Sequence, residues 1–146
     1  MKGFIWFDMD GTIANFYGVD GWLDYLTNGD VFPYVTAKPL FRFSTFARKL
    51  NSLQKEGYLL GIISWTSKGG TDDYNKEVKE AKKKWIKKHL ASVKWDEINI
   101  VPYGTPKERY AKSENDILFD DEKRNRENWT GIAFDVFNIM DVLKSL

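Results

Sequence analysis

Polar side chains that could do chemistry follow four separate apolar runs of this sequence. Acidic residues at the end of a buried strand are costly unless something uses them. If the runs are parallel strands, their carboxyl ends share one edge of a sheet, and these side chains meet there. The residues concerned are Asp8, Asp10, Ser64, Lys107, Asp120 and Asp121.

Carboxylates gathered at one sheet edge would repel one another, and some would stay protonated without a cation nearby. A hard divalent cation resolves the repulsion, and oxygen atoms are the ligands that Mg²⁺ prefers. The sequence contains no cysteine, so thiolate ligands are excluded. We therefore expect an Mg²⁺ site, and its candidate ligands are Asp8, Asp10, Asp120 and Asp121.

Magnesium at this edge would attract a phosphate group, which the neighbouring side chains could process. Lys107 and the hydroxyl of Ser64 can hold phosphate oxygens. Asp8 is then aligned to attack phosphorus, because Mg²⁺ and Lys107 screen the repulsion between the two anions. Asp10 can protonate the leaving oxygen and then deprotonate the water that hydrolyses an aspartyl-phosphate.

Two of these assignments have rivals nearby in the sequence. A shift of the strand end would put Thr66 or Ser67 in the place of Ser64. Lys112 competes with Lys107. We favour Lys107 because it lies at the start of a short helix that faces the strand ends.

Small and aromatic residues beside these side chains are candidates for binding a substrate. Gly11 lets the backbone approach a phosphate closely, and the hydroxyl of Thr12 can tie the turn. Aromatic residues make up 16% of the chain, and rings at the site could stack on a flat ligand. The candidate rings are Phe16, Tyr17 and Trp65, although the rings that follow the first strand could equally form a small core of their own.

The apolar runs predict an α/β fold. Near-continuous apolar strands indicate burial on both faces, as in a parallel sheet between helices. Strands are expected over residues 3–8, 58–64, 97–103, 116–120 and 131–136, and helices over 42–56, 72–91, a short stretch from 105 and about 139–146. The expected architecture is a Rossmann-like three-layer sandwich with a mainly parallel five-stranded sheet. Residues 15–41 are long for a connecting loop and predict a minimal cap insert after the first strand, with a helical turn near 21–27.

Length and composition fit a single domain that spans residues 1–146. The net charge of +1 creates no global attraction to nucleic acid or membrane. No apolar stretch approaches the roughly 20 residues of a membrane span, and the N-terminus lacks a signal-peptide pattern. We therefore expect a soluble, cytoplasmic protein without a membrane partner, in an oligomeric state that the sequence does not determine.

The motifs and their order resemble those of the haloacid dehalogenase-like (HAD) hydrolase superfamily. DMDGT at 8–12 resembles its first motif, Ser64 after LLGII its second, Lys107 its third and ILFDD at 117–121 its fourth. The resemblance implies that Asp8 is the nucleophile and a metal ligand. It implies that Asp10 is the general acid/base, with a backbone carbonyl that also binds Mg²⁺, and that Asp120 and Asp121 complete the metal site. An aspartate two residues after the nucleophile resembles the phosphoryl-transfer branches of the superfamily.

A closer resemblance is to the 5'(3')-deoxyribonucleotidases. DMDGTIANF looks like their DMDG-x-LADF opening, LFDDEKRN resembles their LIDDR region, and GIAFDVFN is similar to their final strand with its asparagine. The chain departs from their pattern at Asn15, where an acidic residue is usual, at Glu122, where an arginine is usual, and in its much smaller cap. The resemblance implies a phosphomonoesterase whose substrate is a small phosphate ester, a (deoxy)nucleoside monophosphate.

Two other functions stay open at this point. Residues 76–94 contain eight lysines and two glutamates, which could follow a nucleic acid backbone or form a solvated helix face. In the first case the protein would resemble the 3'-phosphatase domains of polynucleotide kinase/phosphatases and act on a nucleic acid end. The other function is a non-catalytic phosphate-binding module. Asp10 argues against such a module, because a binder does not need a proton shuttle.

Overall fold

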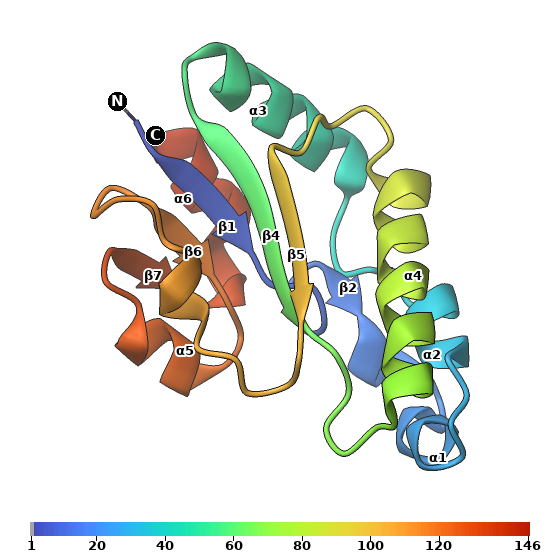
Figure 1. Cartoon of the computed structure of the whole chain (residues 1–146). Coiled ribbons are helices and arrows are strands. Elements are labelled where there is room, and N and C mark those ends of the chain that lie inside the picture. The colour runs from blue at the N-terminus through green and yellow to red at the C-terminus, as the bar shows by residue number, and fades with distance from the viewer. Residues whose placement is uncertain (1) are drawn as a thin grey trace.

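The computed structural model describes residues 2–146, and a five-stranded sheet with parallel neighbours runs through them (Figure 1). Its strands in spatial order are β5 (Glu97–Val101), β4 (Leu59–Trp65), β1 (Phe4–Phe7), β6 (Ile117–Phe119) and β7 (Ile132–Phe134). The predicted α/β class with a mainly parallel five-stranded sheet is confirmed. Because the strands are parallel, the polar residues that follow them gather at one edge.

Helices flank the sheet, and most of them lie where the sequence predicts. They are α1 (Trp22–Thr27), α2 (Phe32–Thr36), α3 (Phe43–Lys55), α4 (Asp72–His89), α5 (Lys123–Asn128) and α6 (Ile139–Ser145). Short 3₁₀ turns cover Phe16–Gly18, Lys107–Tyr110 and Val136–Asn138, and a small hairpin pairs β2 (Ala14–Asn15) with β3 (Lys38–Pro39). Helix α5 was not predicted, because its six residues, KRNREN, carry no apolar stripe.

Within residues 2–146, no helix combines the length and the apolarity that crossing a bilayer requires.

One face of the sheet packs against α3, α6 and the C-terminal half of α4. Helix α3 presents apolar residues at helical spacing, and those it buries are Phe43, Phe46, Ala47, Leu50 and Leu53. They share a core with Trp85 of α4 and Leu143 of α6, above Ile5 and Phe7 of β1. This core fixes the central strand from which the first aspartates emerge.

The opposite face is built around Trp6. Its ring is fully buried and stacks on Phe4 with 4.4 Å between the ring centroids. Gly61 of β4 lies beside Trp6 across the β1–β4 pair, and a Cβ atom at Gly61 would collide with the indole. The ring therefore explains the glycine inside an otherwise apolar strand.

Asp116, just before β6, is a fully buried carboxylate that connects several segments on this face of the sheet by hydrogen bonds. It accepts hydrogen bonds of 2.7 to 3.0 Å from the backbone N–H groups of Phe4 and Lys112, the indole N–H of Trp6 and the hydroxyl of Ser113. Burial by itself would raise the pKa of the Asp116 carboxyl, but these hydrogen bonds outweigh burial and hold the pKa below its usual value. Asp116 thus has a structural role that the sequence did not reveal.

Two strands depart from the expected burial on both faces. β5 and β7 are the edges of the sheet, and each pairs with a neighbour on one side only among the described residues. Ile98 of β5 is exposed, and Ile132 of β7 is 61% exposed. An apolar strand sequence therefore did not distinguish central strands from edge strands.

Residues 15–41, which we call the cap, lie beside the carboxyl edge of the sheet and against α4 (Figure 1). Phe16 and Tyr34 of the cap pack with Tyr74 and Val78 of α4 in a separate buried cluster. Helix α1 occupies the position of the predicted helical turn near 21–27. The cap and α4 together form the side wall of the region that the strand ends face.

Replacing Asp116 with Asn tests its structural role, because the change removes the charge and keeps the size of the side chain. We expect the free energy of unfolding near pH 7 to fall by about 1–3 kcal/mol. The folded-state pKa of Asp116 lies below the unfolded value of about 4. The wild-type advantage is therefore present above that unfolded pKa and is lost as the pH falls through the folded pKa.

Urea unfolding of Asp116→Asn and wild type, in steps from about pH 7 down to about pH 2.5, measures this difference. Asp20→Asn, at an exposed position, is the matched control and should change stability little at any pH. A stability difference for Asp116→Asn that stays constant over the whole pH range would contradict the role of the charge.

Candidate active site

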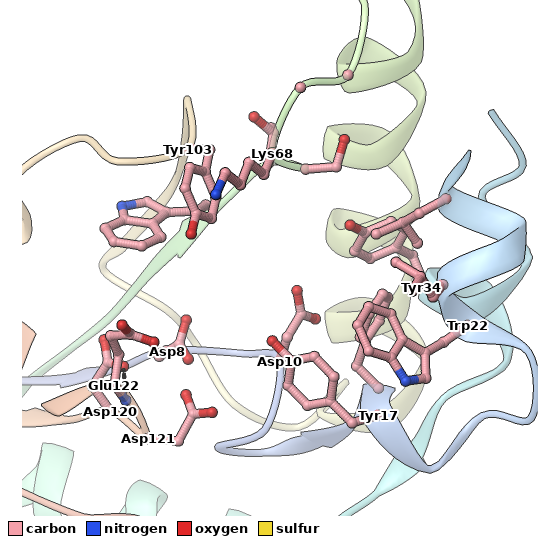
Figure 2. Close-up of a pocket in the computed structure, with 18 of the residues that line it drawn as sticks. Asp8, Asp10, Tyr17, Trp22, Tyr34, Lys68, Tyr103, Asp120, Asp121 and Glu122 are labelled. Carbon is pink, nitrogen blue, oxygen red and sulfur yellow. Dashed lines mark hydrogen bonds between the residues drawn. The ribbon is translucent and has the colours of Figure 1, made fainter. Parts of the chain in front are cut away.

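Asp8 and Asp10 follow β1 in a tight turn. The backbone N–H of Asp8 still donates to the carbonyl of Phe119 in β6 at 3.0 Å, so Asp8 starts from the sheet itself. The carbonyl of Met9 accepts from the N–H of Thr12 at 3.0 Å and closes the turn. Asp10 consequently lies farther from the sheet, nearer the cap (Figure 2).

Lys107 joins the first and the fourth predicted motifs. Its Nζ lies 2.9 Å from Asp8 Oδ1 and 2.6 Å from Asp120 Oδ2, and the side chain is 2% exposed. A buried ammonium group requires such partners, because leaving one unpaired is costly. The rival Lys112 lies at the surface, where it pairs with Glu97 at 3.3 Å. The structure therefore brings Lys107, and not Lys112, to the predicted site.

Thr12 holds Asp8 from the other side. Its hydroxyl donates to Asp8 Oδ2 at 3.1 Å and accepts from the backbone N–H of Asp121 at 3.2 Å. Thr12 is 1% exposed, and it does not line the cavity that opens above these carboxylates. Its hydroxyl links two carboxylate-bearing turns, and its predicted contact with a substrate stays a prediction.

The two aspartates after β6 have different surroundings. Asp120 is fully buried, and besides Lys107 it has Asn125 Nδ2 at 3.2 Å and the backbone N–H of Glu122 at 2.9 Å as donors. Asn125 is a buried residue of α5 that was not among the predicted site residues. Asp121 is exposed and lines the pocket, and a long contact of 3.4 Å from the Thr12 hydroxyl reaches its carboxylate.

The carboxylate cluster carries more negative charge than Lys107 neutralises. Burial disfavours charge on Asp8, but Lys107 outweighs it and holds the pKa of Asp8 below its usual value. Burial and then the charge of Asp8 raise the pKa of Asp120 despite its bond to Lys107, and desolvation and the same charge raise the pKa of Asp121. One oxygen from each of these three aspartates lies within 4.8 Å of the others. The cluster thus offers the donor atoms and the unbalanced charge that suit a divalent cation.

Asp10 pairs with Lys82, a lysine of α4 that is absent from the predicted site residues. Lys82 Nζ lies 2.9 Å from Asp10 Oδ2, and the lysine side chain is 1% exposed. Burial raises the pKa of Asp10, and the charge of Lys82 offsets this only in part. A signal for Lys82 existed in the sequence, because it lies four residues after Val78 and four before Ile86, in the buried stripe of the helix.

Ser64 lies beneath the pocket and not in its wall. It is fully buried, and its Oγ accepts a hydrogen bond of 2.7 Å from Lys82. β4 continues one residue beyond the predicted strand end, to Trp65, so Ser64 stays inside the sheet. Thr66 and Ser67, the rivals for its place, line the pocket. The structure therefore brings Thr66 and Ser67, and not Ser64, to the wall of the pocket.

A cavity of about 490 Å³ opens above the carboxylates, between the sheet edge and the cap (Figure 2). Figure 2 shows Asp8, Asp120 and Asp121 on one side of it, with Asp10 between them and the cap. Figure 2 shows Tyr103 on the sheet side of this opening and Tyr17, Trp22 and Tyr34 on the cap side. Trp65 of β4 and Phe16 of the cap also line the cavity. The cavity is an acidic recess with aromatic side chains on two sides.

The three predicted substrate-binding rings differ in how much surface they present. Trp65 lines the cavity, and its indole N–H donates to the carbonyl of Thr105 at 2.8 Å, which fixes the ring. Tyr17 is 54% exposed. Phe16 is 2% exposed and packs with Tyr74 of α4, so it serves mainly as core of the cap.

Comparisons with known proteins bear on the fold. No family model matches this sequence, and no curated protein matches it either. Among solved structures, the D,D-heptose 1,7-bisphosphate phosphatase from Burkholderia thailandensis has a similar fold, with a TM-score of 0.53 and 15% sequence identity. The match covers 86% of this chain and 70% of that one. At this identity the likeness establishes the α/β, Rossmann-like fold, and function has to be argued from the site.

Gly11 combines a positive φ with close contact to the Asp121 carboxylate, and Gly11→Ala tests how much that contact matters. Gly11 has a φ of +78°, and a Cβ atom there would collide with the Asp121 carboxylate. Gly57, with a φ of +109°, has open space where its Cβ atom would lie, and Gly57→Ala is the matched control.

Both alanine variants carry the backbone strain of about 1–2 kcal/mol. We expect Gly11→Ala to lose a further 1–3 kcal/mol, roughly, because the collision displaces Asp121. Urea unfolding of the two variants measures the difference. Equal losses would show that the turn accommodates a side chain and that Asp121 is free to move.

Proposed function

We propose that this protein is an Mg²⁺-dependent phosphatase that hydrolyses a phosphate monoester through an aspartyl-phosphate on Asp8. The observation that carries the proposal is the environment of Asp8. It is a buried carboxylate kept ionised by Lys107, at the floor of a cavity, with a second acid, Asp10, beside it. The motif order that resembles the HAD superfamily supports the same reaction. The solved structure of similar fold is a phosphatase, which adds a fold-level analogy.

The residues present fit a magnesium ion. Asp8 and Asp121 would supply carboxylate oxygens, and the backbone carbonyl of Asp10 a further one. Asp120 is better placed to hold Lys107 than to bind the ion directly. Its oxygens already accept hydrogen bonds from Lys107, Asn125 and a backbone N–H. Bound there, Mg²⁺ supplies positive charge that offsets the repulsion between the carboxylates and a phosphate.

The reaction then follows from the positions of the two acids. An oxygen of Asp8 attacks phosphorus, and the bond between phosphorus and the ester oxygen breaks. The ester oxygen takes a proton from Asp10 and leaves as an alcohol. Water next attacks the aspartyl-phosphate and passes its proton to Asp10, and phosphate leaves as Asp8 is regenerated. Throughout, Lys107 and Thr12 keep the Asp8 carboxylate in one orientation.

The phosphate oxygens need donors at the pocket wall. Thr66 and Ser67 line the cavity, and their hydroxyl groups suit this role, whereas Ser64 is enclosed. Ser67 is held by Asn75, whose Oδ1 accepts from both the N–H and the hydroxyl of Ser67 at 3.1 and 2.9 Å. Thr66 therefore has the freer hydroxyl of the two for an incoming phosphate.

Hydrolysis of an aryl phosphate with Mg²⁺ and with EDTA tests the reaction. We expect Asp8→Asn to lower turnover by at least about 10³-fold, because the nucleophile is lost. Asp10→Asn should lower it by roughly 10²- to 10⁴-fold, because the water that hydrolyses the aspartyl-phosphate loses its general base. Asp20→Asn, at the surface, is the control and should retain wild-type turnover.

Turnover that survives in Asp8→Asn would rule out the covalent mechanism. A wild-type protein that binds phosphate in calorimetry but hydrolyses no ester would instead be the non-catalytic module.

We further propose that the ester is a nucleoside monophosphate. The cavity volume of about 490 Å³ is in the range of small-molecule sites. A base could stack on the Trp65 and Tyr103 pair, whose ring centroids are 4.9 Å apart, or on Tyr17 and Trp22, at 5.0 Å. A nucleic acid end is the alternative substrate, because lysines such as Lys84 remain exposed on α4.

A panel of 5'- and 3'-deoxynucleotides and 3'-phosphorylated oligonucleotides, assayed at two salt concentrations, distinguishes the two substrates. We expect the mononucleotides to have the higher kcat/KM, with weak dependence on salt. Tyr17→Ala should raise their KM by about 3- to 10-fold through lost stacking. Faster turnover of the oligonucleotides, with a steep loss at the higher salt concentration, would identify the nucleic acid end instead.

A further inference from the structure

Lys82 is a buried cation that the reaction described above does not use. It lies in the middle of α4 and is 1% exposed, whereas Lys79, Lys84 and Lys87 of the same helix are exposed. Burying an ammonium group costs several kcal/mol unless its partners compensate for lost water. The position of Lys82 therefore calls for a specific set of partners.

The ammonium group has three donors, and the structure supplies three acceptors. They are Asp10 Oδ2 at 2.9 Å, Ser64 Oγ at 2.7 Å and the carbonyl oxygen of Trp65 at 2.6 Å. The ring of Tyr34, from the cap, lies 5.2 Å from the same nitrogen. With its donors used inside the protein, Lys82 has none left for a substrate phosphate.

This arrangement ties Asp10 to a rigid part of the fold. Asp10 sits in a turn beyond the end of β1, and its carboxylate lines the cavity at 19% side-chain exposure. Ser64 and the Trp65 carbonyl belong to β4, the neighbour of β1 in the sheet. Lys82 thus connects one oxygen of Asp10 to the end of β4.

We propose that Lys82 is a positioning residue that holds Asp10 in the orientation from which it transfers a proton to the leaving oxygen. Ser64 and the Trp65 carbonyl anchor the ammonium group, so Ser64 acts through Lys82 and not on the phosphate. The inference rests on the proposed function, since it assigns a role to the neighbour of the general acid.

The dependence of kcat/KM on the leaving group tests this role. A p-nitrophenyl phosphate needs little protonation of its leaving oxygen, whereas an alkyl phosphate needs a proton from Asp10. We expect Lys82→Met to lower kcat/KM for the alkyl ester on the order of 10²-fold. The loss for p-nitrophenyl phosphate should stay within about tenfold. Lys84→Met, on the exposed face of α4, is the matched control and should leave both values unchanged.

Ser64→Ala is a second variant, which keeps the charge of Lys82 and removes one of its anchors. We expect the same leaving-group pattern in weaker form, with the inhibition constant of inorganic phosphate unchanged. Circular dichroism of each variant establishes that it is folded. If Lys82→Met does not fold, the pattern in Ser64→Ala decides the matter.

Equal losses for the two esters in the folded variants would overturn the positioning role. A weaker inhibition by phosphate in Ser64→Ala, without the leaving-group pattern, would also overturn it by placing Ser64 on the phosphate. These outcomes are distinct from failure of the proposed function, in which wild type and Lys84→Met hydrolyse neither ester and both proposals fall.

Discussion

The pairing of buried carboxylates with buried lysines at the carboxyl edge of the sheet is the interaction on which the site depends. Asp8 and Asp120 share Lys107, and Asp10 has Lys82. Removing one partner of such a pair leaves a charge buried without compensation, at a cost of about 3–5 kcal/mol. The parallel sheet brings the carboxylates together at one edge, and the lysines reach them from α4 and from the 3₁₀ turn that begins at Lys107.

Lys107 neutralises the carboxylate cluster only in part, and this bears on what the site can bind. Lys107 serves two carboxylates, and the pKa of Asp120 stays raised while that of Asp8 is lowered. Asp121, whose pKa is also raised, is exposed on the side of the cluster that faces the cavity. A cation bound there would complete the neutralisation of the carboxylates. The repulsion between them, which destabilises the isolated cluster, therefore favours the binding of a metal ion.

Much of the fold was predictable from the sequence because its signals are local. The apolar runs marked β1, β4 and β6, and helical spacing marked α3 and α4. The edge strands β5 and β7 were predicted as strands, but their burial was misjudged, because exposure at an edge depends on which strands are neighbours. Helix α5 was missed because it carries no apolar stripe. Asp116 was missed because its partner Trp6 lies 110 positions away. Asn125 lies only five positions from Asp120, to which it donates, and was missed together with α5, the helix that carries it.

The sequence by itself determined which chemical groups are present and that they follow strands, since residue type and periodicity are written along the chain. Asp8, Asp10 and Lys107 could be named in this way. Only the tertiary structure decided that Ser64 faces Lys82 and that Thr66 faces the cavity. The reason is that these surroundings come from distant parts of the chain. Lys82 of α4 encloses the Ser64 hydroxyl, and residues of the cap complete the cavity that Thr66 lines, so only long-range packing brings them together.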